Sequence, residues 1–274
     1  MTIGAPQVVE AQPRVSLPFG LFSVLTFRPD SQGREIAGGI EWRSMPCGPV
    51  TAIDDPDCDT FGTDVGQVEK QFPGSLDIGN ATPFLVYGTD KCGTPGGRAF
   101  DEGVENATAH LLAREEAQAE GAVWRRLARG ATDLNAAGAV SPAEGLALLE
   151  EWMGAQYGSL GAIHMGRRPA TLLGRQNLEK SGSRLLTTLG TPVVAGAGYP
   201  GTSPTTEAVP DPVANAAGVS WMFASPALFG YRGQVFSSSA LDAKMNDHYA
   251  VAERQYVVGF DPCGVGAVRV DLTA

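Results

Sequence analysis

Hydrophobic and polar residues change their spacing several times along the chain, and each spacing predicts a different kind of element. Residues 101–130 contain no proline, and their apolar positions recur every three or four residues, as on one face of a helix. Acidic residues lie near the start of this segment and arginines near its end, as the helix dipole favours. The segment therefore predicts one helix of about 25 residues, about 40 Å long, as the longest helix of the chain.

A second helix is predicted to begin after residue 141. Ser141 is a helix-capping residue, Pro142 suits the first helical position, and Glu144 completes a capping box. A short apolar strand at 161–166 comes next, and a short helix after it opens with the sequence RRPATLL. We therefore expect a mixed region of helices and strands in this part of the chain.

The two ends of the chain, and the stretch from 33 to 92, lack the helical period. Residues 1–30 mix extended apolar stretches with prolines, which predicts an arm that packs along other elements. Residues 33–92 alternate strand candidates with turns and predict a long β-excursion with little core of its own. In the last strand Val268, Val270 and Leu272 alternate with polar residues, so this strand must pair with an earlier one.

The sequence GAGYPG at residues 196–201 matches the G-x-G-x-x-G pattern of dinucleotide-binding enzymes. Such a site needs a helix that begins within the motif, because the phosphate lies at the helix N-terminus. Proline lacks the N–H donor and disfavours helix at the residue before it. Prolines follow the motif's second glycine at positions 200, 204, 210 and 212. We therefore interpret the glycines as a turn before an exposed loop and expect no cofactor.

The amino-acid composition argues against a membrane-spanning protein and against a tight binder of nucleic acid. A hydrophobic fraction of 43% is enough to bury a core, and the 35 glycines and 19 prolines predict many turns. No apolar run approaches the roughly 20 residues of a membrane helix, so we expect no membrane partner. The net charge of −10, with very little lysine, argues against tight nucleic-acid binding through phosphates.

The cysteines and histidines leave several alternatives open. Cys47, Cys58, Cys92 and Cys263 form no CxxC pair, and His110, His164 and His248 lie far from them in sequence. A zinc site would have to be assembled by the fold without support from spacing. A disulfide among Cys47, Cys58 and Cys92 is an alternative outside a reducing cytosol, and buried free thiols are the default.

Other candidate sites have a simpler interpretation. Glu115, Glu116 and Glu120 with His110 could form a helical metal site, but they lack paired E-x-x-H spacing, so a solvated helix face is favoured. The acidic cluster of Asp54, Asp55, Asp57 and Asp59 lacks the glycine and closing glutamate of a calcium loop.

The remaining histidines do not form a catalytic set. His164 lies within a strand and is interpreted as a packed histidine, and the adjacent pair of Asp247 and His248 is not a catalytic geometry. No nucleophile elbow or P-loop lysine motif is present. We predict no catalytic, cofactor-binding or metal-binding residues, and no enzyme.

The order of elements resembles a known family. The capped helix, the strand GAIHMG, the helix RRPATLL and the segment LLTTLGTPVVAGAGY are similar to the axial domain of tailed-phage major capsid proteins of the Hong Kong 97-type fold, which encapsulin shells share. The final segment, with Asn246 followed by AER at 252–254, is similar to their last strands. PFGLFSV and the tryptophan- and cysteine-containing stretch 42–58 resemble capsid proteins of actinobacterial phages.

The resemblance implies an α+β fold in five parts. These are an N-terminal arm at 1–32, an extended β-loop at 33–92, a peripheral domain with a long spine helix at 93–138, an axial domain at 139–235, and strands returning to the peripheral domain at 236–274.

It also implies the function of a shell subunit. Copies of the chain would form hexamers and pentamers of an icosahedral phage head that encloses double-stranded DNA without sequence-specific binding. Assembly would take place in the host cytoplasm, with decoration, scaffold and portal proteins as possible partners. An encapsulin-like nanocompartment, which the non-helical N-terminus disfavours, and a minor capsid subunit are the alternatives. For the covalent cross-link known in one branch, Lys70 and Asn246 are the one pair to consider.

Overall fold

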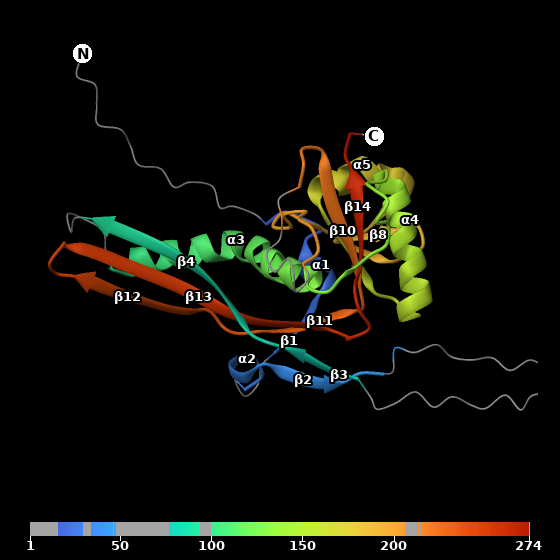
Figure 1. The fold of residues 1–274 in the computed structure, drawn as a ribbon. Coiled ribbons are helices and arrows are strands. Elements are labelled where there is room, and N and C mark those ends of the chain that lie inside the picture. Colours follow the sequence, from blue (N-terminus) through green and yellow to red (C-terminus); the bar gives the residue numbers. More distant parts are fainter. Residues whose placement is uncertain are drawn as a thin grey trace, which may run out of the picture.

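The computed structural model describes residues 16–29, 34–45, 47, 77–93, 100–205, 213 and 215–273. They form an elongated part, in which a long helix lies along a sheet, and a rounded part built on a second sheet (Figure 1). The predicted cluster Asp54–Asp59, Cys58 and Lys70 lie outside the described residues.

The long helix predicted from the sequence is confirmed as α3 (Phe100–Ala128), with 29 residues. It lies on one face of the five-stranded sheet (Figure 1). The strands of this sheet are β1 (Thr26–Pro29), β4 (Phe84–Gly93), β11 (Leu228–Arg232), β12 (Phe236–Asp242) and β13 (Asp247–Phe260). The long strand β13 is central, with β4 along one edge and β12 and β11 along the other.

Alternating small and apolar side chains allow α3 to pack closely on this sheet. Ala250, Ala252 and Tyr256 of β13 are buried with Val86 of β4 and with apolar residues of the helix. A Cβ atom at Gly88 would lie 2.7 Å from the carbonyl oxygen of Ala107, so glycine is required for this approach. The odd-numbered residues between Leu85 and Lys91 alternate with this buried set and face away from the helix.

The second sheet has seven strands in the order β5-β14-β10-β6-β9-β8-β7. These are β5 (Thr132–Asp133), β6 (Ala162–Gly166), β7 (Leu178–Ser181), β8 (Arg184–Thr187), β9 (Pro192–Gly196), β10 (Val219–Ser225) and β14 (Gly266–Asp271). The pairing of β6 with β9 is parallel, and that of β10 with β14 is antiparallel.

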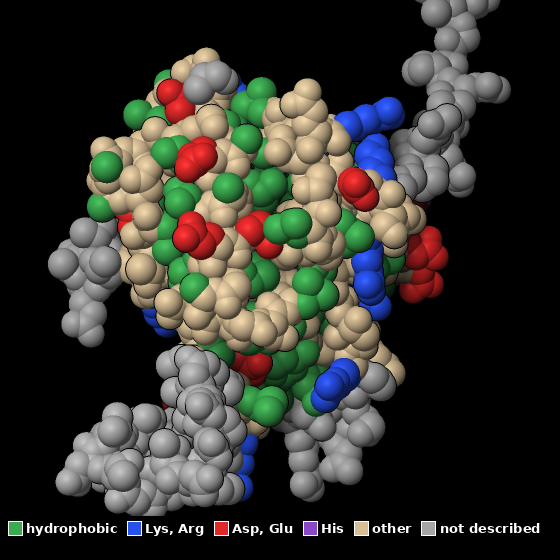
Figure 2. Space-filling view, turned by 90° about the vertical axis from the view of Figure 1, so that its right-hand side faces the viewer, with side chains coloured by type: hydrophobic (Ala, Val, Ile, Leu, Met, Phe, Trp, Pro, Cys, Tyr) green, Lys and Arg blue, Asp and Glu red, His purple; other side chains and the backbone are tan. Residues whose placement is uncertain are grey.

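Helices cover this second sheet. They are α4 (Pro142–Trp152), continued by the π-turn η2 (Met153–Tyr157), and α5 (Arg167–Asn177). The predicted cap of α4 is confirmed, because Oγ of Ser141 accepts a hydrogen bond from the N–H of Glu144. Figure 2 shows this side of the molecule, where hydrophobic side chains are scattered among polar ones.

The N-terminal elements are short and depend on other parts of the chain. They are α1 (Leu21–Val24), α2 (Arg34–Gly38), and the hairpin of β2 (Ile40–Arg43) with β3 (Ile78–Ala81). The side chain of Leu21 is fully buried between α3 and the second sheet. The hairpin lies below the five-stranded sheet in Figure 1, where Ala81 packs with Ile36 and Val257.

The two sheets meet at the C-terminal end of α3. Trp124 is fully buried there and packs edge-on against Phe223 of β10, with ring centroids 4.6 Å apart. Val258 of β13 and Ala267 of β14 belong to the same cluster. The predicted return segment 236–274 is thus divided, since β12 and β13 lie beside α3 whereas β14 joins the seven-stranded sheet. The five-part division of the chain stays a prediction.

Candidate functional site

The glycines of GAGYPG lie at the end of β9 and in the loop after it, and the first two of them lie against the side of α3. A Cβ atom at Gly198 would be only 1.7 Å from the carbonyl oxygen of Ala117, and one at Gly196 would be 2.7 Å from the ring of Tyr199. Gly201 has φ +68°, which favours glycine. Residues 197–205 contain no helix. Close backbone packing therefore explains the glycines, in agreement with the interpretation as a turn.

The prediction that Glu115, Glu116 and Glu120 lie on a solvated face of α3 is wrong for two of these residues. Glu115 is 7% exposed and Glu120 is 1% exposed. The Glu115 carboxylate accepts two hydrogen bonds from Arg254, at 2.8 and 2.9 Å, and one from the hydroxyl of Tyr256 at 2.6 Å. This ion pair with its added hydroxyl fixes α3 to β13, and the arginine balances the buried charge.

Glu116 and Glu120 bind backbone N–H groups of other segments. Oε1 of Glu116 accepts from the N–H of Phe22 at 2.8 Å, and Oε1 of Glu120 accepts from the N–H of Leu21 at 3.0 Å. The second oxygen of Glu120 accepts from the N–H of Gly198 at 2.7 Å. Burial raises the pKa of both carboxyls above its ordinary value.

The glutamates thus hold α1, the glycine loop and β13 against one helix. His110, their proposed metal partner, is exposed, and its ring lies 3.4 Å from the carbonyl oxygen of Thr89. Within the described part of the chain no cluster of three or more metal-ligating side chains occurs. The burial of Glu115 could have been inferred from the sequence. Glu115 is spaced four residues from Leu111 and from Ala119, and both lie on the buried face of α3.

His164 of β6 is fully buried between two hydroxyl groups. Its Nδ1 lies 2.9 Å from the Tyr199 hydroxyl, and its Nε2 lies 2.9 Å from Oγ of Ser225. The Ser225 hydroxyl donates to the carbonyl of Pro226, so it accepts from the imidazole rather than being activated by it. Burial lowers the pKa of His164 to about 3. The imidazole is therefore a neutral core group, as the interpretation as a packed histidine expects.

The cysteines differ from the expectation. Cys47 forms a disulfide with Cys263, not with Cys58 or Cys92, and Cys92 is half-buried. The default of buried free thiols is therefore wrong for Cys47 and Cys263. The two residues are 216 positions apart, and the turn between β13 and β14 brings them together, which residue spacing could not reveal.

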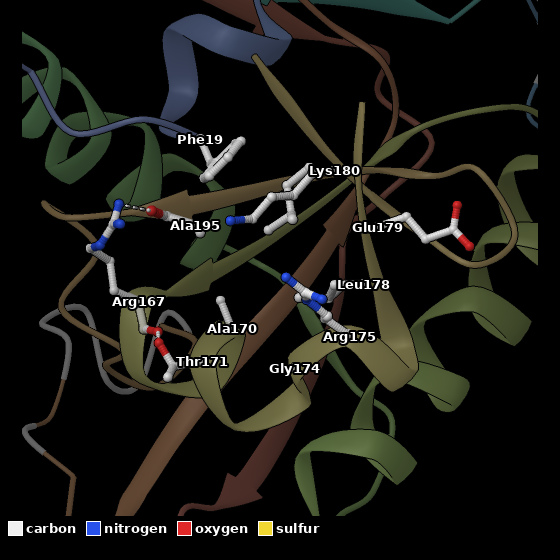
Figure 3. A pocket seen from close by; sticks show the side chains of 11 residues that line it. Phe19, Arg167, Ala170, Thr171, Gly174, Arg175, Leu178, Glu179, Lys180 and Ala195 are labelled. Atoms are coloured by element: carbon white, nitrogen blue, oxygen red, sulfur yellow. Dashed lines mark hydrogen bonds between the residues drawn. The ribbon is translucent and has the colours of Figure 1, made fainter. Parts of the chain in front are cut away.

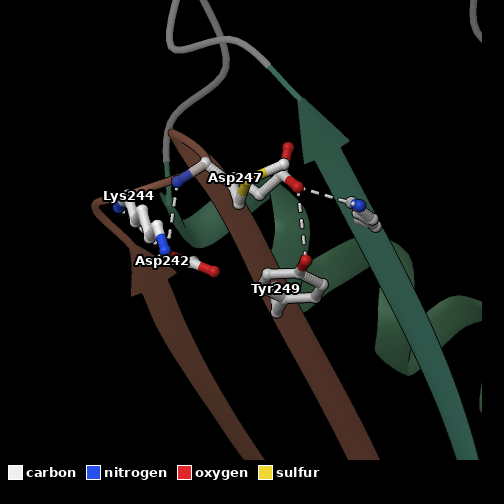
Figure 4. A network of polar contacts seen from close by, with 6 residues as sticks. Asp242, Lys244, Asp247 and Tyr249 are labelled. Carbon is white, nitrogen blue, oxygen red and sulfur yellow. Dashed lines mark hydrogen bonds and ion pairs between the residues drawn. The ribbon is translucent and has the colours of Figure 1, made fainter.

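The tip of the elongated sheet is fixed by polar contacts (Figure 4). Asp247 accepts hydrogen bonds from Nζ of Lys91 at 2.8 Å and from the Tyr249 hydroxyl at 3.2 Å. The hydrogen bond to Lys91 lowers the pKa of Asp247, and the same bond raises the pKa of Lys91. In the turn between β12 and β13, Oδ1 of Asp242 accepts from the N–H of Lys244 at 2.9 Å, and Asn246 has φ +56°.

The face of this sheet that points away from α3 carries large exposed hydrophobic side chains. Tyr87 is 65% exposed and Phe236 is 64% exposed, and both lie opposite Glu253 in the strand register. A hollow of about 410 Å³ on this sheet is bordered by Leu85 and Phe236. All seven residues of β12 are exposed, and β12 is an edge strand. Exposed apolar faces and free strand edges are typical contact surfaces for other chains.

A hollow of about 640 Å³ lies between α5, β7 and the segment before α1 (Figure 3). Its polar lining is mostly basic, with Arg167, Arg175 and Lys180, and the Glu179 side chain points away from them. Arg167 donates to the carbonyl of Pro18 at 3.0 Å, and the Lys180 ammonium lies 5.3 Å from the centre of the Phe19 ring. These contacts hold the N-terminal segment on the second sheet.

Among the described residues, no helix combines the length and the apolar character needed to cross a membrane. No protein-family model matches the chain. No curated protein matches it by sequence.

Solved structures match over nearly the whole chain. The capsid of a native GTA particle has a TM-score of 0.55 at 12% identity, covering 98% of this chain and 96% of that one. A Gordonia phage Cozz structure has a TM-score of 0.52 at 13% identity, covering 97% and 91%. The SrpI encapsulin of Synechococcus elongatus PCC 7942 has a TM-score of 0.53 at 10% identity, covering 99% and 94%. The predicted α+β class is confirmed, and the chain has the Hong Kong 97-type capsid fold.

Proposed function

We propose that this chain is the major capsid protein of a tailed phage, and that its copies assemble into hexamers and pentamers of an icosahedral head enclosing double-stranded DNA. The observation that carries the proposal is the extent of the match. The fold spans 98% of this chain and 96% of the GTA capsid subunit, so neither protein has a large part without a counterpart.

The surface of the elongated sheet supports self-assembly. Its open face exposes Tyr87 and Phe236, and one side of its edge strand β12 pairs with none of the described strands. Repeated copies under closed symmetry would cover such surfaces with the same contacts each time. A net charge of −10 suits an inner wall that encloses DNA without binding a particular sequence.

The proposed role is structural. The one close serine–histidine contact among the described hydrogen bonds, between Ser225 and His164, is completely buried, and the serine donates to a backbone carbonyl. A nucleophile and its base need access to substrate, which this pair lacks. We propose a place in the virion, assembly in the host cytoplasm, and scaffold, portal or decoration proteins as partners.

An encapsulin-like shell is the second candidate, because the SrpI encapsulin matches with a TM-score of 0.53. A minor capsid subunit is the third. Purified particles distinguish these functions by their contents, since a phage head holds DNA and an encapsulin holds a protein cargo. A chain that forms no closed shell alone, and joins only shells of another protein, would be a minor subunit.

The test is size-exclusion chromatography and negative-stain electron microscopy of the recombinant protein. We expect rings or closed shells from the wild type. Phe236→Glu should prevent closed shells, because it places a charge on the open sheet face. Ser237→Glu is the matched control on the next residue of β12, which points to the opposite side. A wild-type chain that stays monomeric would overturn the proposal.

The domain division is tested by shortening the predicted extended loop. The N–H of Ser44 donates to the carbonyl of Asp77 at 2.9 Å, so the chain on the two sides of residues 48–76 is close together. A short glycine–serine linker in place of 48–76 should leave a folded, soluble subunit and abolish closed shells. Normal shells from this variant would contradict the proposed role of the loop in assembly.

A further inference from the structure

We propose that Cys47 and Cys263 are a site of oxidative modification that acts as a covalent staple, closed after the shell has assembled. The inference rests on the proposed function. The two Cα atoms are 5.2 Å apart, within the usual range for a disulfide. Cys47 follows β2 of the hairpin, and Cys263 lies in the turn between β13 and β14. The bond therefore links the hairpin to a turn that joins the two sheets.

Noncovalent contacts place the two cysteines together without the bond. Nε1 of Trp42 donates to Oδ1 of Asp261 at 3.2 Å, and the Trp42 ring packs edge-on against Phe229, with centroids 4.7 Å apart. Ala81 of the hairpin is buried against Val257 of β13. None of these contacts depends on sulfur, so a chain with two free thiols should dock its hairpin in the same place.

The turn that carries Cys263 is also fixed from the second sheet's side. The other oxygen of Asp261 lies 3.3 Å from the Tyr157 hydroxyl at the end of η2, which donates to it. Asp261 therefore binds Trp42 and Tyr157 at once, and it lies two residues before Cys263. Because both thiols are held by neighbours on a formed surface, closing the bond needs little rearrangement.

The cysteines are accessible and have no competing thiol among the described residues. Cys47 and Cys263 are both only half-buried, so small oxidants and reductants reach the sulfur atoms. Cys92 pairs in register with His248, at the far end of β13 from Cys263. Strand β13 runs from Asp247 to Phe260, about 40 Å at 3.3 Å per residue, so Cys92 is too distant for exchange.

The compartment sets the timing of the reaction. In a reducing cytosol both side chains stay thiols, and the chain folds and assembles through noncovalent contacts. After release, a small-molecule disulfide such as oxidised glutathione accepts two electrons. One cysteine thiolate attacks it, which gives a mixed disulfide and releases one glutathione thiolate. The second cysteine thiolate attacks the mixed disulfide and releases the other glutathione thiolate, and the two cysteine protons pass to the two released thiolates. The product is the Cys47–Cys263 bond, which restricts local opening of the hairpin.

Alkylation in the cell and oxidation of purified particles test the timing and the effect. Cells that produce the full chain are treated with a permeant alkylating reagent before lysis, and peptides are identified by mass spectrometry. We expect alkylated Cys47 and Cys263. Particles purified without the reagent and then treated with oxidised glutathione should contain the linked peptides, and should open at a temperature several degrees higher than reduced particles.

Matched variants separate the staple from general effects of oxidation. Cys47→Ser should abolish the gain in heat resistance, and Cys92→Ser should keep it. Reduced wild-type particles test without any substitution whether the gain in heat resistance depends on the Cys47–Cys263 bond. Linked peptides in the cells treated before lysis, or equal resistance of oxidised and reduced particles, would overturn the staple alone. Absence of shells in both redox states would overturn the proposed function, and the staple with it.

Discussion

The N–H of Gly198 donates a 2.7 Å hydrogen bond to Oε2 of Glu120, so a buried carboxylate binds the glycine loop to the long helix. The other oxygen of Glu120 accepts from Leu21, 99 residues away in sequence. One side chain on α3 thereby fixes the N-terminal segment and the loop after β9. A carboxylate suits this position because both of its partners are backbone donors.

Replacing Glu120 by alanine should lower the free energy of unfolding by about 2–5 kcal/mol, because two buried backbone donors lose their acceptor. The measurement is equilibrium urea denaturation of the unassembled subunit. Glu105→Ala, an exposed position on the same helix, is the control and should change stability by less than about 0.5 kcal/mol. Equal losses from the two variants would show that the Glu120 contacts do not stabilise the fold.

Gly198→Ala should be severely destabilising or prevent folding. The added Cβ would lie 1.7 Å from the carbonyl oxygen of Ala117, a backbone atom that cannot move without shifting α3. Gly154→Ala is the matched control, because nothing lies within 4 Å of a Cβ there. Soluble yield and thermal unfolding compare the two variants.

The same glycine loop gives a test of the nucleotide alternative. Calorimetric titration of the wild type with NAD or ATP should show no saturable binding, because Gly196 and Gly198 pack against α3 and no helix begins among residues 197–205. Saturable binding to the wild type would restore the dinucleotide-site interpretation of GAGYPG.

The sequence predicts features that depend on neighbouring residues. The spacing of apolar residues predicts α3, and Ser141 with Pro142 predicts the start of α4, since periodicity and capping are local. The role of Glu120 could not be predicted in this way. A polar residue on a helix is normally solvated, and its two donors come from segments 99 and 78 positions away.

The disulfide likewise could not be predicted from neighbouring residues, because its two cysteines are even farther apart in sequence. Cys47 and Cys263 become neighbours only when β13 crosses the molecule and the hairpin of β2 and β3 docks beside its end. The open sheet face is an intermediate case. The first four residues of β4, at 84–87, are all apolar and do not show which face is buried, so only the packing of α3 decides that Tyr87 lies on the uncovered one.

Trp124→Ala should lower the free energy of unfolding by about 3–5 kcal/mol, because it leaves a cavity where the two sheets meet. The Trp124 ring is fully buried against Phe223, and its Nε1 donates to Oγ1 of Thr202 at 3.0 Å. Trp124→Phe keeps part of the ring packing and should lose less. Chemical denaturation measures both variants, and a loss of less than about 1 kcal/mol for alanine would contradict the core position.

Protonation of His164 should destabilise the fold at acidic pH. Burial lowers its pKa from the ordinary 6.5 to about 3, so between these values the unfolded chain binds a proton that the folded chain does not. Stability therefore falls as the pH drops from 6.5 towards 3, by up to about 5 kcal/mol from this group. Glu116 and Glu120 act in the opposite direction, because their raised pKa values favour folding at low pH and lose this contribution as the pH rises.

His164→Gln separates these effects, since glutamine can still accept from the Tyr199 hydroxyl and donate to Ser225 but does not titrate. Unfolding free energies of the wild type and the variant are measured by denaturation at several pH values from 7.5 to about 4, below the ordinary pKa of the imidazole. The glutamates contribute equally to both proteins, so the difference between the two curves reports His164. We expect the variant to be less stable at neutral pH and the difference to shrink steadily below about pH 6.5. Parallel curves would mean that the imidazole becomes protonated without unfolding, and that His164 is more accessible to water than its position in β6 indicates.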